Sequence, residues 1–391
     1  MPSSRFTFRV LILVVLIAGV SQGLTIPLLA VLLEEQGVST VVNGLNAAAL
    51  YVGVVLASPF LEIPLRRIGY RSTILYGLGL VTLATVLLPV FSNLTIWFVL
   101  RLLMGIGDSS LHYASQMWVT KIAAPERRGR DLSLYGLAYG IGFSIGPLGM
   151  YLLPFGMWVP FAAVCAIYLV AFGLLSRILN AYPDPVPMAE RKENRYAAVF
   201  RLGWLALIPS FLYGFMETSL NGSFPVYALR VGVSVEWVAI LLPSFVVGSI
   251  LLQMPLGSLS DRLGRKPVMV ACALVGAAAF CLFPLAGSHV WLMMALLAVA
   301  GAAVGSFYSL GLAYATDILP GSMVPTAGII AGMNFGVASI LAPNVNGFLM
   351  EYVAPWMMFT VMAMMLTGFA VCSLFFRRTR PEKPQSDAVV A

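Results

Sequence analysis

Charged residues are scarce in this sequence. Asp, Glu, Lys and Arg make up 10% of its 391 residues, whereas 60% are hydrophobic and the mean hydropathy is +0.92. A soluble domain carries about 25% charged residues, so the charges here are too few to cover a surface that faces water. This composition excludes an ordinary soluble domain and favours a protein whose surface faces lipid.

Cysteine and histidine are also rare, with four and two residues. The cysteines all lie within apolar runs, and none has C-x-x-C spacing or a nearby His, so they are interpreted as small buried hydrophobic residues. The sequence contains no phosphate-binding loop, nucleotide fingerprint or zinc-ligand spacing. We therefore expect no metal, no cofactor and no ATP-driven transport by this chain alone.

Long apolar runs are what the sequence has instead. A hydrocarbon core about 30 Å thick takes roughly 20 residues of helix to cross, and in lipid the backbone must satisfy its own hydrogen bonds. The fold class predicted is an all-α membrane protein. Twelve transmembrane helices are expected, at 8–33, 41–61, 72–92, 94–119, 132–155, 157–178, 199–228, 235–257, 268–287, 289–315, 324–349 and 354–376.

The basic residues lie mainly on one side of this arrangement. With the N-terminus placed inside, all of the 23 Lys and Arg residues except Arg101 and Arg230 fall on the side of the two termini. This is the positive-inside asymmetry of membrane proteins, so both termini are predicted to be cytoplasmic. The asymmetry also explains the net charge of +7, and no nucleic acid is expected as a partner.

A short charged turn, GSLSDRLGRK at 257–266, has a second and altered copy. Leu-Gly-x-Lys at 263–266 is matched 195 residues earlier by Ile-Gly-x-Arg at 68–71, and Gly-Val-Ser at 232–234 is matched by 37–39. A duplication of six spans follows, in which both halves cross the bilayer in the same direction. We expect an N-terminal bundle at 1–178, a cytoplasmic linker at 179–198, a C-terminal bundle at 199–376 and a cytoplasmic tail at 377–391.

The G-x-L-x-D-R-x-G-R-K pattern at 257–266, its altered copy and the six-plus-six repeat resemble the major facilitator superfamily. The resemblance implies a secondary transporter whose two bundles rock about a central site, and family members are commonly monomers. It also implies that Asp261 helps to hold a closed state, whereas Arg66 stands at that position in the first copy and Glu62 nearby. Alternatively, the charges only set topology. The candidate gating residues are Asp261, Arg262, Gly264, Arg265, Lys266, Arg67, Gly69 and Arg71.

Ionisable groups inside spans are costly and tend to mark function. Arg101, Asp108 and His112 are seven and four residues apart, so they share one face of the fourth helix. Arg101 also resembles the R-x-x-x-G signature of the family's fourth helix, which implies a role in proton or substrate handling. In span seven, Glu217 and Asn221 share a face in the same way.

The functional interpretation is that Asp108 and Glu217 alternate between protonated and ionised forms as their access to water changes. The structural alternative is that Asp108 neutralises Arg101, Glu217 bonds to neighbouring hydroxyl groups, and His112 is only a hydrogen-bonding part of the wall. Both interpretations remain open on the sequence.

Span five contains glycines at 136, 140, 142 and 146, followed by Pro147. Such spacing allows helices to pack closely in lipid, and the proline permits a bend. Gly142-x-x-x-Gly146-Pro147 also resembles the fifth-helix motif of the family's antiporters, which favours export, although Met150 and Tyr151 depart from that motif. Ser144 fits G-x-S-x-G but lacks the strand that a nucleophile elbow needs, so no catalytic residue and no enzyme activity are expected.

Taken together, these patterns predict a proton-coupled, multi-pass transporter of the cell membrane that exports small amphipathic or hydrophobic organic compounds. Aromatic residues in two presumed cavity helices favour such substrates. The alternatives are an importer of a small metabolite, proton-coupled or passive, and a non-transporting sensor on the same fold. The aromatic residues are Phe211, Tyr213, Phe215, Phe307 and Tyr308.

Overall fold

The computed structural model describes residues 4–124, 127–183 and 195–376. In these residues it contains twelve helical stretches that are long and apolar enough to cross a membrane. Each of the twelve predicted spans coincides with one of them, which confirms the all-α membrane fold. The predicted tail at 377–391 and residues 184–194 of the predicted linker lie outside the described residues.

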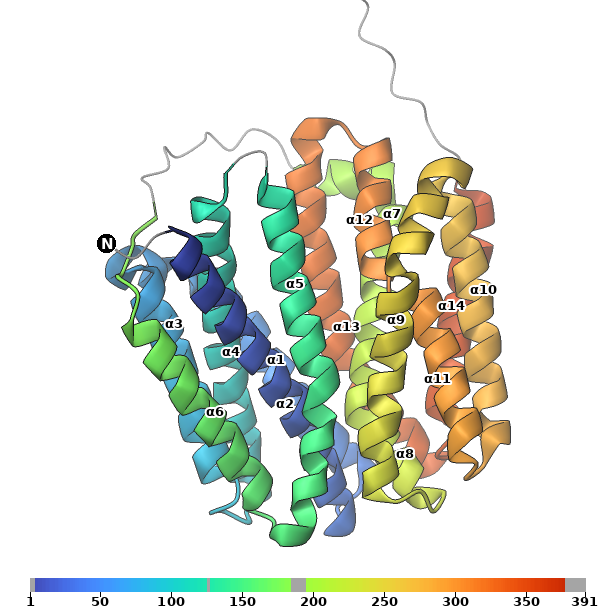
Figure 1. The fold of residues 1–391 in the computed structure, drawn as a ribbon. Helices are drawn as coiled ribbons and strands as arrows, with labels where there is room; N and C mark the ends of the chain where they lie inside the picture. The colour runs from blue at the N-terminus through green and yellow to red at the C-terminus, as the bar shows by residue number, and fades with distance from the viewer. Residues whose placement is uncertain (1–3, 125–126, 184–194, 377–391) are drawn as a thin grey trace, which may run out of the picture.

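The N-terminal half, as we define it here, comprises the first six stretches (Figure 1). Two of these helices have a side-chain N-cap. Ser39 Oγ accepts from the N–H of Val42, and Asn93 Oδ1 accepts from the N–H groups of Thr95 and Ile96. The helices are α1 (Ser4–Glu35), α2 (Thr40–Ala57) with η1 (Ser58–Phe60), α3 (Glu62–Leu87), α4 (Leu94–Ile122), α5 (Arg128–Ile145) with η3 (Gly146–Phe155), and α6 (Val159–Ser176).

The C-terminal half comprises the other six stretches, two of which are interrupted within the span. A π-helical turn interrupts the seventh stretch, and residues 305–306 interrupt the tenth. The elements are α7 (Arg195–Thr218), η4 (Ser219–Ser223) and α8 (Phe224–Arg230); α9 (Val235–Leu263); α10 (Arg265–Leu282) and η5 (Phe283–Ala286); α11 (Val290–Val304) and α12 (Phe307–Ile318); η6 (Gly321–Met323) and α13 (Val324–Tyr352); and α14 (Met357–Phe375).

The duplication appears in the backbone as well as in the sequence. Gly69 and Gly264, at matching places in the two turns, have φ values of +83° and +95°. Residues with a side chain rarely adopt a positive φ, so glycine is needed at these two positions. A Cβ on Gly53 would lie 2.2 Å from a backbone oxygen of α4, and one on Gly248 would lie 2.1 Å from a backbone oxygen of α11. The same close helix crossing therefore occurs in each half.

The two halves lie side by side, and the described ends of the chain are on the same side of the molecule (Figure 1). We call this the termini side; the other side, where α1 ends and α2 begins, we call the opposite side. The halves meet where α2 packs on α13, η3 on α9, and α1 on η4 and α8. The central residues of the site belong to these helices and to α4, α5, α7 and α12.

A candidate transport site between the two halves

The three predicted ionisable residues lie on one face of α4, and their exposed fraction rises along the helix. Arg101 is 2% exposed, while the side chains of Asp108 and His112 are 14% and 23% exposed. Gln116, one turn further toward the termini side, is exposed. The exposed fraction of this face therefore rises toward the termini side, and Arg101 lies at its buried end.

Arg101 is buried against backbone carbonyl groups of two neighbouring helices. Its Nη1 donates to the carbonyl oxygen of Asn46 at 3.5 Å, and its Nη2 donates to that of Ile26 at 3.4 Å. Within the described residues its Nε has no partner and no carboxylate pairs with it. The alternative in which Asp108 neutralises Arg101 is wrong for this state of the protein.

His112 joins Asp108 to the aromatic side chains of α5. Its Nε2 lies 3.5 Å from Oδ1 of Asp108, and its Nδ1 lies 3.0 Å from the hydroxyl of Tyr135. The rings of His112 and Tyr139 pack in a T-shaped arrangement at a centroid distance of 5.0 Å. The hydroxyl of Tyr139 donates to Oε1 of Gln22 on α1 at 2.6 Å. Three helices of the N-terminal half thus contribute to one polar cluster.

Sequence reasoning missed Tyr135 and Tyr139 as members of this cluster. They are four residues apart in span five, so they share a helix face, and that spacing was the available signal. Gly142 lies further along α5, Gly146 begins η3, and both pack on α1. A Cβ on either would lie 2.1 Å or 2.5 Å from a backbone oxygen of α1, so close packing accounts for both. That these glycines and Pro147 form an antiporter motif stays a prediction.

Glu217 lies on α7, two residues before the π-helical turn η4. Asn221 donates from Nδ2 to the backbone oxygen of Glu217 at 2.7 Å, so this bond leaves the carboxylate free. Within the described residues, the Glu217 carboxylate has no hydrogen bond or ion pair and is partly exposed. π-helical turns often accompany functional sites. Bonding of Glu217 to neighbouring hydroxyl groups, the structural alternative, is not what the structure contains.

Tyrosines from both halves lie within electrostatic range of Glu217. In the C-terminal half, Phe335 lies 6.2 Å from Tyr213 and 6.2 Å from Tyr308 between ring centroids. Tyr51 and Tyr139 of the N-terminal half lie within electrostatic range of both Glu217 and Asp108. The two carboxyl groups therefore border one region between the halves. Of the other predicted aromatic residues, Phe211 is partly exposed, while Phe215 and Phe307 are buried in helix packing.

These central side chains lie well inside their spans, and yet they are partly exposed. This holds for Tyr139 on α5, Tyr213 and Glu217 on α7, and Tyr308 on α12. Together with the gradient along α4, this partial exposure favours access to the region from the termini side.

On the opposite side, by contrast, the halves are bonded together. Thr40 of α2 donates from its N–H and its hydroxyl to Oε2 of Glu351 on α13, at 2.9 Å and 2.6 Å. Arg230 at the end of α8 donates from Nε to Oε1 of Glu34 on α1 at 2.7 Å. Arg230 Nη2 also lies 4.0 Å from Glu351. We call these four residues the polar closure.

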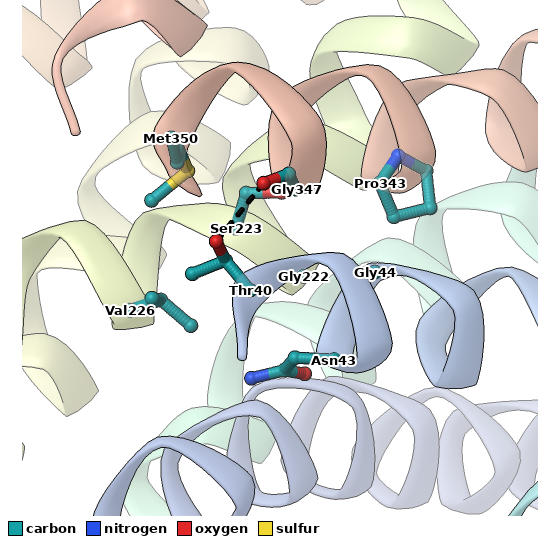
Figure 2. A pocket seen from close by; sticks show the side chains of 9 residues that line it. All are labelled: Thr40, Asn43, Gly44, Gly222, Ser223, Val226, Pro343, Gly347 and Met350. Carbon is teal, nitrogen blue, oxygen red and sulfur yellow. Dashed lines mark hydrogen bonds between the residues drawn. The ribbon is translucent and has the colours of Figure 1, made fainter. Parts of the chain in front are cut away.

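Helix packing beside the polar closure leaves very little room. Figure 2 shows Thr40 reaching the carbonyl oxygen of Gly347, which it donates to at 2.9 Å, with Met350 and Val226 alongside. The cavity that these residues line measures about 10 Å³, which is about the space of one water molecule. A Cβ on Gly44 would lie 2.2 Å from the carbonyl oxygen of Pro343. A solute has no passage here.

The C-terminal copy of the charged turn forms an ion-pair network. Arg265 pairs with Asp261 at 2.5 Å and with Asp317 of α12 at 3.4 Å. Lys266 donates from Nζ to the backbone oxygen of Phe376 at 2.9 Å, and Arg262 is exposed. The predicted gating residues therefore lie together at one end of the C-terminal half.

The N-terminal copy is held by different groups. Asn180, just after α6, donates from Nδ2 to the backbone oxygen of Ile68 at 2.6 Å and accepts from the N–H of Arg71 at 2.9 Å. Arg66 pairs with Glu62 at 2.6 Å, while Arg67 is exposed. Sequence reasoning treated residue 180 as part of the linker and missed its role at the turn that contains Gly69.

Comparison with known proteins agrees with this architecture. The sequence model of the Major Facilitator Superfamily matches residues 11–243 and residues 206–391. The chain is similar to YfkF of Bacillus subtilis strain 168, an uncharacterized MFS-type transporter, at 42% identity over 89% of this chain and 90% of the relative. It is also similar to Multidrug resistance protein 2 of that organism, at 23% identity over 69% of this chain and 70% of the relative.

Among solved structures, the nucleoside transporter NupG has the same fold. The two structures superpose with a TM-score of 0.75 at 14% sequence identity, over 96% of this chain and 99% of that chain. At this identity the likeness concerns the fold alone.

Proposed function

The chain belongs to the Major Facilitator Superfamily, and we propose that this transporter uses a proton gradient to export small amphipathic or hydrophobic organic compounds. It is a multi-pass membrane protein, and we place it in the cell membrane with both termini in the cytoplasm. The termini side is then the cytoplasmic side, and the present state is closed to the outside. In this proposal, the bundles at 1–178 and 199–376 rock against each other as units of a monomer.

The observation that carries the coupling proposal is the pair of carboxyl groups between the halves. Asp108 is on one half and Glu217 on the other; within the described residues neither pairs with Arg101, and both residues are partly exposed. If the halves rock, the same groups face water on the opposite side. A carboxyl group that exchanges protons with one side of the membrane in one state, and with the other side in the second state, carries protons across the membrane.

The substrate proposal rests on the aromatic rings and the charge around Glu217. Tyr51, Tyr139, Tyr213, Tyr308 and Phe335 offer flat apolar surfaces with few amide groups between them. Within the described residues neither carboxylate pairs with an Arg or Lys, which favours neutral or positively charged compounds over anions. The similarity to a protein named for multidrug resistance supports export of this class of compound.

Transport by purified protein in vesicles tests the proposal. Vesicles with an imposed pH gradient, acidic inside, should accumulate a lipophilic dye cation as protons leave, in the protein orientation whose termini side faces outward. Reversal of the gradient should reverse the movement. Movement of the dye in the same direction as protons would favour the importer, and no movement of any of a panel of organic compounds would favour the sensor.

A further inference from the structure

A second cavity lies away from the central site, on the termini side of the N-terminal half. It has a volume of about 360 Å³ and lies between the ends of α3, α4 and α5. Tyr70, Tyr113 and Met117 form part of its wall. The volume falls in the range of small-molecule sites, and the transport cycle proposed above does not use this cavity.

The lining of this cavity is basic. Arg66, Lys121 and Arg128 line it together with one carboxylate, Glu62. Glu62 is already paired with Arg66, and Lys121 donates from Nζ to the backbone oxygen of Tyr182 at 2.7 Å. In the part of the chain that the structure describes, the side chain of Arg128 has no hydrogen bond or ion pair. Among the lining residues that the structure describes, three cations therefore stand against one carboxylate.

The C-terminal half has the opposite charges at the matching places. Arg66 corresponds to Asp261 at the offset of 195 residues, and Lys121 corresponds to Asp317 at 196. Asp261 and Asp317 are both bonded to Arg265. In the N-terminal half, two cations therefore border a cavity at the places where two carboxylates hold an arginine in the other half.

Local helix stability gives no reason for the position of Arg128. It is the first residue of α5, and a cation in the first turn of a helix is disfavoured by the helix dipole. An acidic residue would suit this place better. The positive-inside asymmetry accounts for a cation on this side of the membrane, and an anion from outside the chain would favour one at this place in particular.

We propose that this cavity binds a phosphate group, either in the headgroup of an anionic phospholipid or in a soluble phosphorylated compound. Arg and Lys are the side chains that recognise phosphate oxygens through charge-assisted hydrogen bonds. Basic pockets between transmembrane helices on the cytoplasmic side recognise lipid headgroups in this way. Arg128 and Lys121 supply the main contacts to the phosphate, and Tyr113 supplies a neighbouring hydroxyl group. The inference is independent of the proposed substrate and of proton coupling.

The test compares Arg128→Glu with Arg130→Glu. Arg130 is an exposed cation two residues further along α5 and does not line the cavity, so the net charge of the two variants is equal. Thermal unfolding of purified protein in detergent is followed by tryptophan fluorescence while a ligand is titrated, because a ligand of the folded state raises the midpoint. One arm adds phosphatidylglycerol against phosphatidylcholine; the other adds glycerol 3-phosphate against NaCl at equal ionic strength.

In at least one arm, the apparent affinity should fall tenfold or more in Arg128→Glu and less than twofold in Arg130→Glu. A response in the lipid arm alone identifies a phospholipid headgroup, and a response to glycerol 3-phosphate identifies a soluble source. Lys121→Gln should weaken the same arm, which keeps the test valid if Arg128→Glu does not fold. The proposal is overturned if neither ligand raises the midpoint of the unmodified protein, or if both variants respond alike.

Discussion

The two sides of the contact between the halves differ in kind. On the opposite side, the four residues of the polar closure bond one half to the other, and Gly44 brings α2 within contact of the α13 backbone. Toward the termini side, Asp108, His112 and Gln116 become progressively more exposed. The difference shows that closure here is made by a few polar bonds and one tight helix crossing, while the central carboxyl residues stay partly exposed.

The tight crossing gives the largest expected effect. In Gly44→Ala, the added Cβ would lie 2.2 Å from the carbonyl oxygen of Pro343, so the opposite side cannot close as it does here. We expect at least a 90% loss of transport in vesicles, with the protein still folded because Ala favours helix by about 1 kcal/mol over Gly.

The control for this change is Gly332→Ala on α13, where a Cβ would meet nothing within 4 Å. It should transport normally. Normal transport by Gly44→Ala would show that the crossing of α2 and α13 is not needed for closure.

The second largest effect concerns the partly exposed residue Glu217 on α7. Glu217→Gln removes the titratable group but keeps its shape, so gradient-driven accumulation should fall at least tenfold while exchange without a gradient continues. Vesicle uptake with and without a pH gradient separates the two activities. Glu236→Gln, an exposed acid at the start of α9, should change neither. Full active transport by Glu217→Gln would remove Glu217 from the coupling mechanism.

The polar closure gives a smaller effect at its buried end. Thr40→Val removes the hydroxyl that donates to Glu351, a hydrogen bond to a charged group of the kind that contributes about 1.5–3 kcal/mol. The population open on the opposite side should rise tenfold or more. Labelling of Asn43→Cys, beside the small cavity, by an impermeant maleimide measures that population in a background with the native cysteines replaced by Ser. An unchanged labelling rate would mean that Thr40 does not hold the halves together.

The exposed end of the polar closure should give the smallest effect. Arg230→Gln breaks the pair with Glu34, and such exposed pairs contribute about 0–1 kcal/mol. The labelling rate of the same cysteine should rise at most about fivefold, and 1 M NaCl should raise it similarly in the unmodified protein because salt screens the pair. Arg177→Gln, an exposed residue at the end of α6, is the matched control. A larger change than that of Thr40→Val would reverse the order of the two contacts.

The fold was predictable because its signals are local or periodic. Apolar runs of bilayer length predicted the twelve spans, and the repeated turn at 68–71 and 263–266 predicted two halves that run in parallel. The helical spacing of Asp108 and His112 likewise placed both on one face, where the structure has them 3.5 Å apart.

The missing parts of the site depend on contacts between distant residues. Thr40 and Glu351 are 311 residues apart in sequence, and neither stands out beside its neighbours. Asn180 bonds to a turn 109 residues away at Arg71. Whether Asp108 pairs with Arg101 depended on the direction in which Arg101 points, which helix periodicity does not specify. Only the packed helices settle these pairings.

The π-helical turn η4 has a geometric consequence for the whole seventh span. A π turn holds one residue more than an α turn, and one residue of α-helix corresponds to a rotation of about 100°. Conversion of Ser219–Ser223 to regular helix would therefore swing Phe224–Arg230 around the axis of the span and carry the Arg230 guanidinium away from Glu34. A change in helix type a few residues from Glu217 would thus break the Arg230–Glu34 contact of the polar closure on the opposite side, without any movement of α1.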